Sequence, residues 1–239
     1  MTKVYLLALV VVTACAPVYV PNVRNSPMFT KGGEFQASVQ VGNGLETQAS
    51  FSVTDHFGVM TNFSFLDRTR FNPDNQNDYH RHTLMEGGVG YFNNEGPRFF
   101  EVFAGYGRGE GSSVDEYIFF GSQSTAATGK YERYFVQPAF GITNKEVDVS
   151  FVSRFSLVDF YAFSNELAST AINEKPKVLF EPAVVGRANF AKKHMFILFQ
   201  GGVSFGMSQN IYFDRRAFQF STGIGLRLGG KKDLIKRID

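Results

Sequence analysis

The feature that most constrains the fold of this chain is a two-residue alternation of apolar and polar side chains that starts near Gly33 and continues almost to the C-terminus. Between Phe35 and Val41, Phe, Ala and Val alternate with Gln and Ser, and between Phe218 and Leu228 apolar residues alternate with Gln, Ser, Gly and Arg. Successive side chains of a β-strand point to opposite faces, so this period predicts strands with one apolar and one polar face. About ten such segments, each long enough for a tilted membrane strand, predict an all-β fold: an antiparallel, up-and-down transmembrane β-barrel of about ten strands. If one hairpin is a flap outside the ring, the barrel has about eight strands instead.

The connections between these segments alternate in length. Bacterial outer-membrane barrels have short periplasmic turns and long outer loops, with an even number of strands. Short connections fall at 54–56, 93–97, 143–146 and 188–193, and long polar ones at 67–82, 109–130, 159–176 and 208–217. The pattern therefore predicts that both ends of the barrel lie on the periplasmic side.

Alternation alone leaves open which face meets water, because a soluble sandwich or lipocalin-like barrel would turn the same apolar residues inward. The placement of lysine favours a membrane. All eleven lysines lie in the N-terminal signal, the connections or the tail, with Lys177 at the start of a strand. The polar faces carry mainly Gln, Ser, Asn and Gly, which suits a narrow lumen, and Tyr91, Tyr106 and Tyr134 near strand ends are typical of an interfacial girdle.

The N-terminus has the layout of a bacterial secretion signal. A basic start at Met1–Lys3 is followed by the apolar run Val4–Val12, which is too short for a transmembrane helix. The following Val-Thr-Ala-Cys resembles a lipobox, in which Cys15 is acylated and becomes the first residue of the mature chain. Cys15 is the only cysteine, so a disulfide within the chain is excluded and lipidation accounts for the residue. The alternative is an ordinary signal peptide that contains a cysteine.

These features divide the chain into four parts. We expect a signal peptide at 1–14, a lipidated periplasmic linker at 15–32, a transmembrane β-barrel at 33–228 and a basic periplasmic tail at 229–239. The tail is suited to lipid phosphate or a partner protein, with a plainly solvated tail as the alternative.

Three segments carry a family resemblance: Tyr19–Phe29 with its Pro-Asn pair, Gly33–Ala37 and Val53–Met60. They resemble small outer-membrane β-barrel lipoproteins of Bacteroidota, most clearly over Cys15–Phe65. The resemblance implies an outer-membrane location in a bacterium with two membranes. It implies no reaction.

A search for catalytic chemistry yields little. Neither a Gly-x-Ser-x-Gly elbow nor a His-Glu-x-x-His motif occurs. His80 and His82 share a face if their segment is extended, and Asp78 is near, so a loose metal or catalytic site is conceivable; solvated loop residues are the favoured interpretation. We therefore expect no catalytic residues, no metal and no cofactor other than the covalent lipid on Cys15. The net charge of +2 gives no electrostatic support for nucleic-acid binding.

Charged residues on the polar faces are the remaining candidates for a site. The inward-facing set, predicted as a lumen charge network, is Glu86, Glu101, Asp148, Arg154, Glu181, Arg187 and Arg227, with Glu46 on the same face. These side chains either line a pore or pair and close it, and the narrow interior of such a barrel favours pairing.

The sequence thus predicts a non-catalytic outer-membrane lipoprotein, both integral and lipid-anchored, that acts as an accessory or structural subunit of an outer-membrane assembly. Its expected partners are outer-membrane lipid and other outer-membrane proteins, because the aromatic segments Tyr117–Phe120 and Ile211–Phe213 are predicted to be exposed in loops. The alternatives are a small-solute channel, a surface-loop hydrolase and a soluble ligand-binding lipoprotein.

Overall fold

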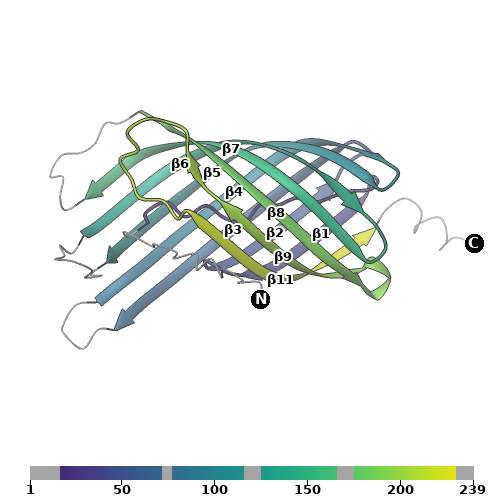
Figure 1. Cartoon of the computed structure of the whole chain (residues 1–239), viewed down its shortest axis with the longest axis horizontal. Helices are drawn as coiled ribbons and strands as arrows, with labels where there is room; N and C mark the ends of the chain where they lie inside the picture. Colours follow the sequence, from purple (N-terminus) through teal and green to yellow (C-terminus); the bar gives the residue numbers. More distant parts are fainter. Residues whose placement is uncertain (1–16, 72–76, 116–124, 166–174, 230–239) are drawn as a thin grey trace, which may run out of the picture.

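The strands close into a single ring of antiparallel neighbours (Figure 1). The computed structural model describes residues 17–71, 77–115, 125–165 and 175–229. Its strands are β1 (Glu34–Val41), β2 (Leu45–Ser52), β3 (Phe57–Phe71), β4 (Asn77–Glu95), β5 (Arg98–Asp115), β6 (Thr125–Thr143), β7 (Val147–Asn165), β8 (Lys177–Phe190), β9 (Met195–Val203), β10 (Phe205–Gly206) and β11 (Phe218–Gly229). A single 3-10 turn, η1 (Ala191–Lys193), joins β8 to β9. Among the described residues, no helix is long and apolar enough to cross a membrane.

Each long strand pairs with the next one along the chain, from β1 to β9, and β9 then pairs with β11. The ring closes where β1 meets β11, with Phe35 opposite Leu228 and Val41 opposite Thr222. The two-residue β10 lies against β8 beyond the end of β9, so it adds no position to the ring. The prediction of an all-β, antiparallel, up-and-down barrel with ten strands is therefore confirmed, and the eight-strand alternative is wrong.

The distribution of side chains is the inverse of that in a water-soluble protein. Apolar residues cover the outside of the strands: Phe220 is 69% exposed and Val89 is 65% exposed. Charged residues fill the inside, where Glu101 and Arg154 have no exposed surface. Since large exposed apolar area is unfavourable in water, this exterior requires an apolar surrounding.

The outer surface of β5 shows the height of the apolar zone. Its outward positions from Phe100 to Tyr106 are apolar or aromatic, and they are bounded by Arg98 at one end and Arg108 at the other. The ten residue steps from Arg98 to Arg108, at about 3.4 Å each and tilted by about 45°, rise about 24 Å, which sets the height of the apolar zone between the two arginines. This matches the apolar band of about 25 Å that outer-membrane barrels present to lipid.

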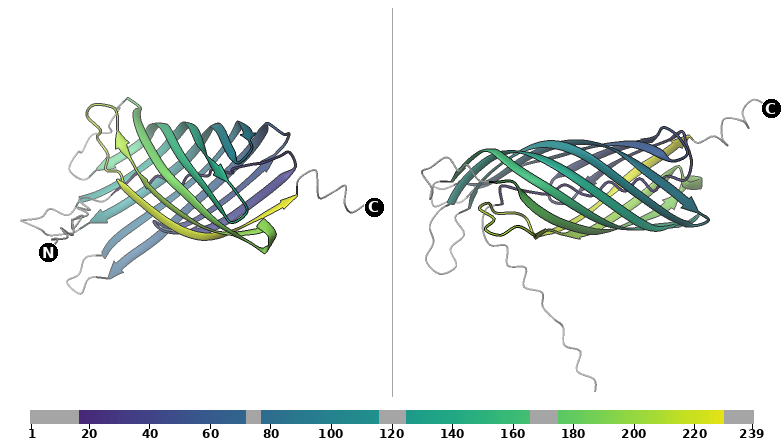
Figure 2. Two further views of the ribbon diagram at one scale, coloured as in Figure 1. Left: turned by 45° about the vertical axis from the view of Figure 1, so that its right-hand side comes forward. Right: turned by 90° about the horizontal axis from the view of Figure 1, so that it is seen from above.

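The segment before β1 lies inside the barrel. Every residue of Val18–Phe29, which we call the lumen strap, is buried. Figure 2 shows the strap, in purple, running along the interior from the end with the long connections to the end with the short turns. The periplasmic linker expected at 15–32 is thus wrong for this stretch, because a lumen lined by small polar side chains has to be filled. Residues 1–16, with the expected signal peptide and Cys15, and the tail from 230 onward lie outside the described residues.

The long connections also differ from the prediction. Much of 67–82 and 109–130, and the first part of 159–176, is strand, since β3 to β7 extend past the apolar zone and continue to pair there. The connection after β10 folds back over the mouth of the barrel, where Phe213 is only 4% exposed. The expectation of an exposed aromatic patch at Ile211–Phe213 is therefore wrong, because these side chains cover the lumen; Tyr117–Phe120 lies outside the described residues.

Candidate functional site

The barrel interior holds a charge network that joins the strands to the lumen strap. The structure places all the residues of the predicted lumen network inside the barrel, each of them less than 9% exposed: Glu86, Glu101, Asp148, Arg154, Glu181, Arg187 and Arg227. Glu46 is buried there as well. The described part of the chain buries six carboxylates and six cationic side chains in all, so the interior is balanced in formal charge; the strap supplies one of the cations, Arg24.

The densest part of the network surrounds Glu86 of β4. Its carboxylate forms a close ion pair with Arg133 of β6 and lies 3.6 Å from Nη2 of Arg154 on β7. Asn22 of the strap donates its amide to Glu86 over 2.7 Å. The side-chain oxygen Oδ1 of Asn22 accepts a hydrogen bond from each arginine, both at 2.7 Å. One strap side chain therefore bonds both the carboxylate and its two cations, which satisfies groups that are costly to bury unpaired.

A second cluster forms around Glu181 of β8. Tyr19 of the strap donates its hydroxyl to one carboxylate oxygen over 3.0 Å, and Ser156 donates to the other over 2.7 Å. The guanidinium of Arg24 donates to the main-chain carbonyl of Glu181 over 3.0 Å. The backbone of Arg24 is bonded in both directions by the amide of Gln200, at 2.6 and 2.9 Å. The side chain of Gln200 thus satisfies the backbone N–H and C=O groups of Arg24, which in a sheet would bond to a neighbouring strand.

The third cluster lies nearer the short turns. Ser26 of the strap donates to Glu101, and its hydroxyl lies 2.8 Å from that of Ser150. Arg187 donates to the strap carbonyls of Pro27 and Ser26 at 2.9 and 2.6 Å. Arg227 of β11 donates to Asp148 of β7 over 3.1 Å. The strap is therefore held along its length by charged groups from several strands.

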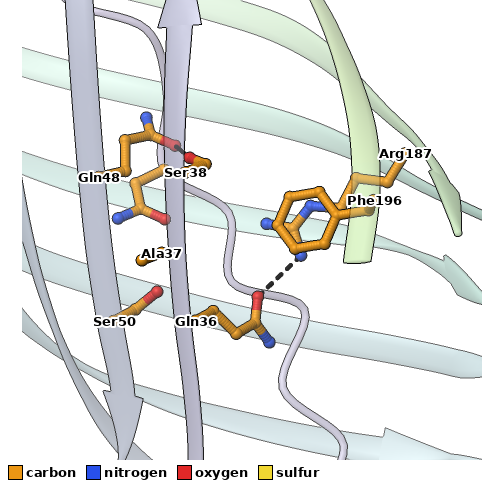
Figure 3. Close-up of a pocket in the computed structure, with 8 residues that line it drawn as sticks. Gln36, Ala37, Ser38, Gln48, Ser50, Arg187 and Phe196 are labelled. Carbon is orange, nitrogen blue, oxygen red and sulfur yellow. Dashed lines mark hydrogen bonds between the residues drawn. The ribbon is translucent and has the colours of Figure 1, made fainter. Parts of the chain in front are cut away.

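The cavity beside Arg187 is too small for a ligand (Figure 3). Figure 3 shows Arg187 and Gln36 pointing toward one another across it, with a hydrogen bond of 2.8 Å between them. The cavity volume is about 10 Å³, which is room for about one water molecule. The lumen around the strap is accordingly filled at this point rather than open.

Glycine gives the strap its space at the end with the long connections. A Cβ atom on Gly111 of β5 would stand 1.9 Å from the carbonyl oxygen of Val18, which is closer than any real contact. The strap also pairs with the connection before β11: the Tyr19 amide donates to Asp214 over 3.1 Å, and Arg216 donates its amide to Tyr19 over 3.0 Å. Burial raises the pKa of Asp214 above its ordinary value.

An aromatic cluster closes the same end. Tyr19 packs against Tyr131 and Phe213 with ring centroids 5.2 and 6.0 Å apart, and Phe160 lies 4.6 Å from Phe213. Leu84 and Leu179 belong to the same buried cluster. This end of the lumen is thus sealed by apolar packing above the ionic network.

His80 and His82 lie in β4 and not in a solvated loop. Their rings are 5.7 Å apart, and His82 is 2% exposed. Ser64 lies 3.0 Å from Nε2 of His82 but donates its single hydroxyl proton to Glu46 over 2.8 Å. In a nucleophilic triad the acid orients the histidine and the histidine takes the serine proton. Here the acid binds the serine and not the histidine, so the three side chains are not arranged in the order of a triad.

Within the four described ranges, no group of three or more His, Cys, Asp or Glu side chains is arranged to hold a metal ion.

The network contains residues that the sequence-based prediction left out. Arg133 is absent from the predicted network, and the strap residues fall in the predicted periplasmic linker. The sequence did contain one signal: Tyr19–Phe29 combines Asn, Arg and Ser with Val, Met and Phe, a mixture too apolar for a solvated segment.

Comparisons with known proteins add no functional assignment. No protein-family model matches the sequence, and no curated protein is significantly similar to it. Among solved structures, in-vitro folded OmpT, an outer membrane protein of Vibrio cholerae, matches with 8% identity and a TM-score of 0.21, over 82% of this chain and 96% of that one. A loop L8 deletion mutant of OmpT matches with 7% identity and a TM-score of 0.15, over 82% of this chain and 97% of that one. The fold assignment rests on the strand pairing, because likeness at this level carries no argument.

Proposed function

We propose that the chain is an integral outer-membrane β-barrel lipoprotein without catalytic activity, which serves as a structural or accessory subunit of an outer-membrane assembly. The observation that carries the proposal is the inverted barrel: apolar side chains outside over a height of about 24 Å, and charged side chains within. The polar end of that zone on the side of the long connections supports insertion in a membrane, since the ion pairs Arg81–Asp67 and Arg108–Glu132 lie just beyond it.

A closed interior supports a structural role over a transport role. The strap, the ionic clusters and the aromatic seal occupy the lumen along its length. Solutes cross a barrel through a water-filled channel. A barrel in this state therefore presents its surface, its connections and its lipid anchor to other components rather than a path through itself.

Three features of the sequence support the outer-membrane location and the anchor. The first is the lipobox-like segment ending at Cys15, the second is the basic tail after Gly229, and the third is the resemblance of Tyr19–Phe29 to barrel lipoproteins of Bacteroidota. Acylation would hold the chain to lipid even before the barrel is inserted.

The direct test combines heat-modifiability with lipid labelling. We expect the unheated protein from the membrane fraction to migrate as a compact band in detergent gels, and to shift to its full apparent mass on boiling. Cells fed radiolabelled palmitate should label the wild-type chain, whereas Cys15→Ala should remain unlabelled. A chain that stays monomeric and soluble without detergent would exclude the integral barrel. A wild-type chain that is heat-modifiable but carries no palmitate would exclude the lipid anchor and support the barrel alone.

A small-solute channel is the second candidate, and one observation favours it. Among the described residues, the strap forms one isolated backbone bridge, between Tyr19 and Arg215, and many of its other hydrogen bonds are made by side chains. Its withdrawal would leave a lumen lined by charged groups. Planar bilayers decide between the two: we expect silence from the full chain, and steady conductance that changes on Glu181→Gln would replace the structural proposal with a channel.

A further inference from the structure

The direction in which the strap passes through the barrel is fixed by contacts at its two ends. At the start, the Val18 carbonyl lies against Gly111 of β5, and Tyr19 bonds to the connection between β10 and β11. At the finish, Gly32 donates its amide to Asp55 over 2.8 Å, in the short turn between β2 and β3. The chain thus enters at the mouth with the long connections and reaches β1 at the opposite rim (Figure 2).

The start of the strap lies beyond the apolar zone. Gly111 is three residues past Arg108 on β5, and Arg108 marks the polar edge of the band. Gly229, at the end of β11, pairs with Glu34 at the other rim. The two ends of the described chain, near Pro17 and Gly229, are therefore separated by the full height of the barrel.

We infer that the barrel carries its own N-terminal segment through its lumen to the outer face, so that an acyl chain on Cys15 would insert in the outer leaflet of the membrane. The side assignment and the acylation rest on the proposed function, in which the long connections face outward. The passage itself rests on the strap contacts. The barrel thus gains a further role, as the conduit that displays the N-terminus at the cell surface.

Chain length excludes an inner-leaflet anchor while the strap is in place. Cys15 is two residues from Pro17, and two extended residues span at most about 7 Å. The apolar zone alone is about 24 Å high, and Val18 is already beyond it. A lipid on Cys15 at the inner leaflet would require the strap to be withdrawn from its hydrogen bonds to the barrel strands.

The strap is also fixed in register, so it cannot slide to shorten that distance. Asn22, Arg24 and Ser26 each bond to a different strand group: the Glu86 cluster, the Glu181 cluster and Glu101. A shift by one residue would place Val23 or Pro21 at the carboxylate of Glu86. That would remove the hydrogen bonds that Asn22 makes to Glu86, Arg133 and Arg154, and loss of hydrogen bonds to buried charged groups is destabilising.

The test uses full-length chains expressed in cells, with a short epitope and a protease site inserted between Ala16 and Pro17. A second chain carries the same insertion after Gly229. Protease is added to intact cells and to permeabilised cells, and loss of the epitope is measured. We expect the first insertion to be cleaved in intact cells, and the second only after permeabilisation.

Each other outcome overturns the inference. Cleavage of the first insertion only after permeabilisation places the N-terminus on the periplasmic side. An uncleaved first insertion in permeabilised cells, with the second cleaved, leaves the segment enclosed. Cleavage of both insertions in intact cells puts the two ends on one side. Heat-modifiability of the same chains is scored separately, so a failure of the barrel proposal is distinguishable from a barrel whose N-terminus stays inside.

Discussion

The carboxylate of Glu86 should be the most costly single charge to remove from the lumen. It has no exposed side-chain surface and contacts two equally buried arginines, Arg133 and Arg154. It also accepts hydrogen bonds from Asn22 at 2.7 Å and from Asn62 at 2.6 Å. Glu86→Gln keeps the size of the side chain, removes the charge, and brings an amide donor against two cations.

The magnitude follows from the burial of the pair. Removing one partner of a buried ion pair costs about 3–5 kcal/mol, because the remaining charge stays desolvated without compensation. We therefore expect Glu86→Gln to lower the free energy of unfolding by about 3–5 kcal/mol, which is about two to four powers of ten in the folding equilibrium. The second arginine acts in the same direction, because it loses the same carboxylate.

The assay is a urea titration in detergent micelles, followed by circular dichroism and by the compact gel band, since the chain has no tryptophan for fluorescence. Unfolding and refolding curves must coincide for a free energy to be extracted. The matched control is Glu132→Gln, which removes a carboxylate 2.5 Å from Arg108 on the outer edge of the barrel, where water screens the pair. We expect little change there. If Glu86→Gln unfolds at the same urea concentration as the wild type, the lumen network does not hold the barrel together and the reasoning fails.

Two further predictions concern the strap. In refolded protein that lacks Cys15, the double variant Ser26→Cys and Ser150→Cys should form a disulfide, because the two hydroxyls are 2.8 Å apart. The disulfide is detected as a loss of thiols that react with maleimide. Ser26→Cys with Ser156→Cys should keep both thiols, since Ser156 is six residues, about 20 Å, further along the same face of β7; equal cross-linking of both pairs would contradict the placement. Gly111→Ala should speed amide hydrogen exchange in the strap, because its Cβ meets a strap carbonyl at 1.9 Å, whereas Gly87→Ala, with its nearest neighbour at 3.7 Å, should not. Identical exchange in the two variants would show that the strap does not pass beside β5.

Most of the fold could be predicted from the sequence because a barrel strand follows a local rule. Whether a residue points into the lumen depends only on its parity along the strand. The alternation from Phe35 to Val41 and from Phe218 to Leu228 shows which side chains point out, although the two strands are at opposite ends of the chain. Their pairing then follows from closure, because the first and last strands of a barrel have no other unpaired edge to meet.

The site was less predictable because its contacts are not local. Parity places Glu86, Arg133 and Arg154 inside, but which of them meet depends on the stagger between strands. The position of a side chain along the barrel axis is also not readable from the sequence. Ion pairs between non-adjacent strands, such as β4 and β6, therefore cannot be predicted from it. His80 and His82 were predicted to lie in a loop, but β3 and β4 continue to pair beyond the apolar zone and include both residues in β4.

The strap was missed for a different reason: it belongs to no strand and follows no hairpin. Its burial depends on the volume that the lumen leaves empty. β1 and β2 present Ser38, Ser50 and Ser52 inward, and Gly111 leaves further room on β5. Many small inward residues on a ring of ten strands leave more space than their own side chains fill. A sequence-based argument would therefore have to compare the volume of the lumen with the volume of the inward side chains, rather than examine the sequence of the strap itself.

In a barrel with a polar core, we expect substitutions inside the lumen to lower the stability more than substitutions on the outer surface. In a soluble domain, burial of apolar side chains is the main stabilising term, and polar substitutions on the surface are tolerated. Here the apolar side chains face outward, where surrounding lipid or detergent can replace lost contacts, while the interior depends on ion pairs and hydrogen bonds that have no substitute partner. Asn22 is the sharpest case, since one neutral amide bonds Glu86, Arg133 and Arg154 at once. The strap is therefore a structural part of the barrel core, and a change in any of its polar residues alters the strands that hold it.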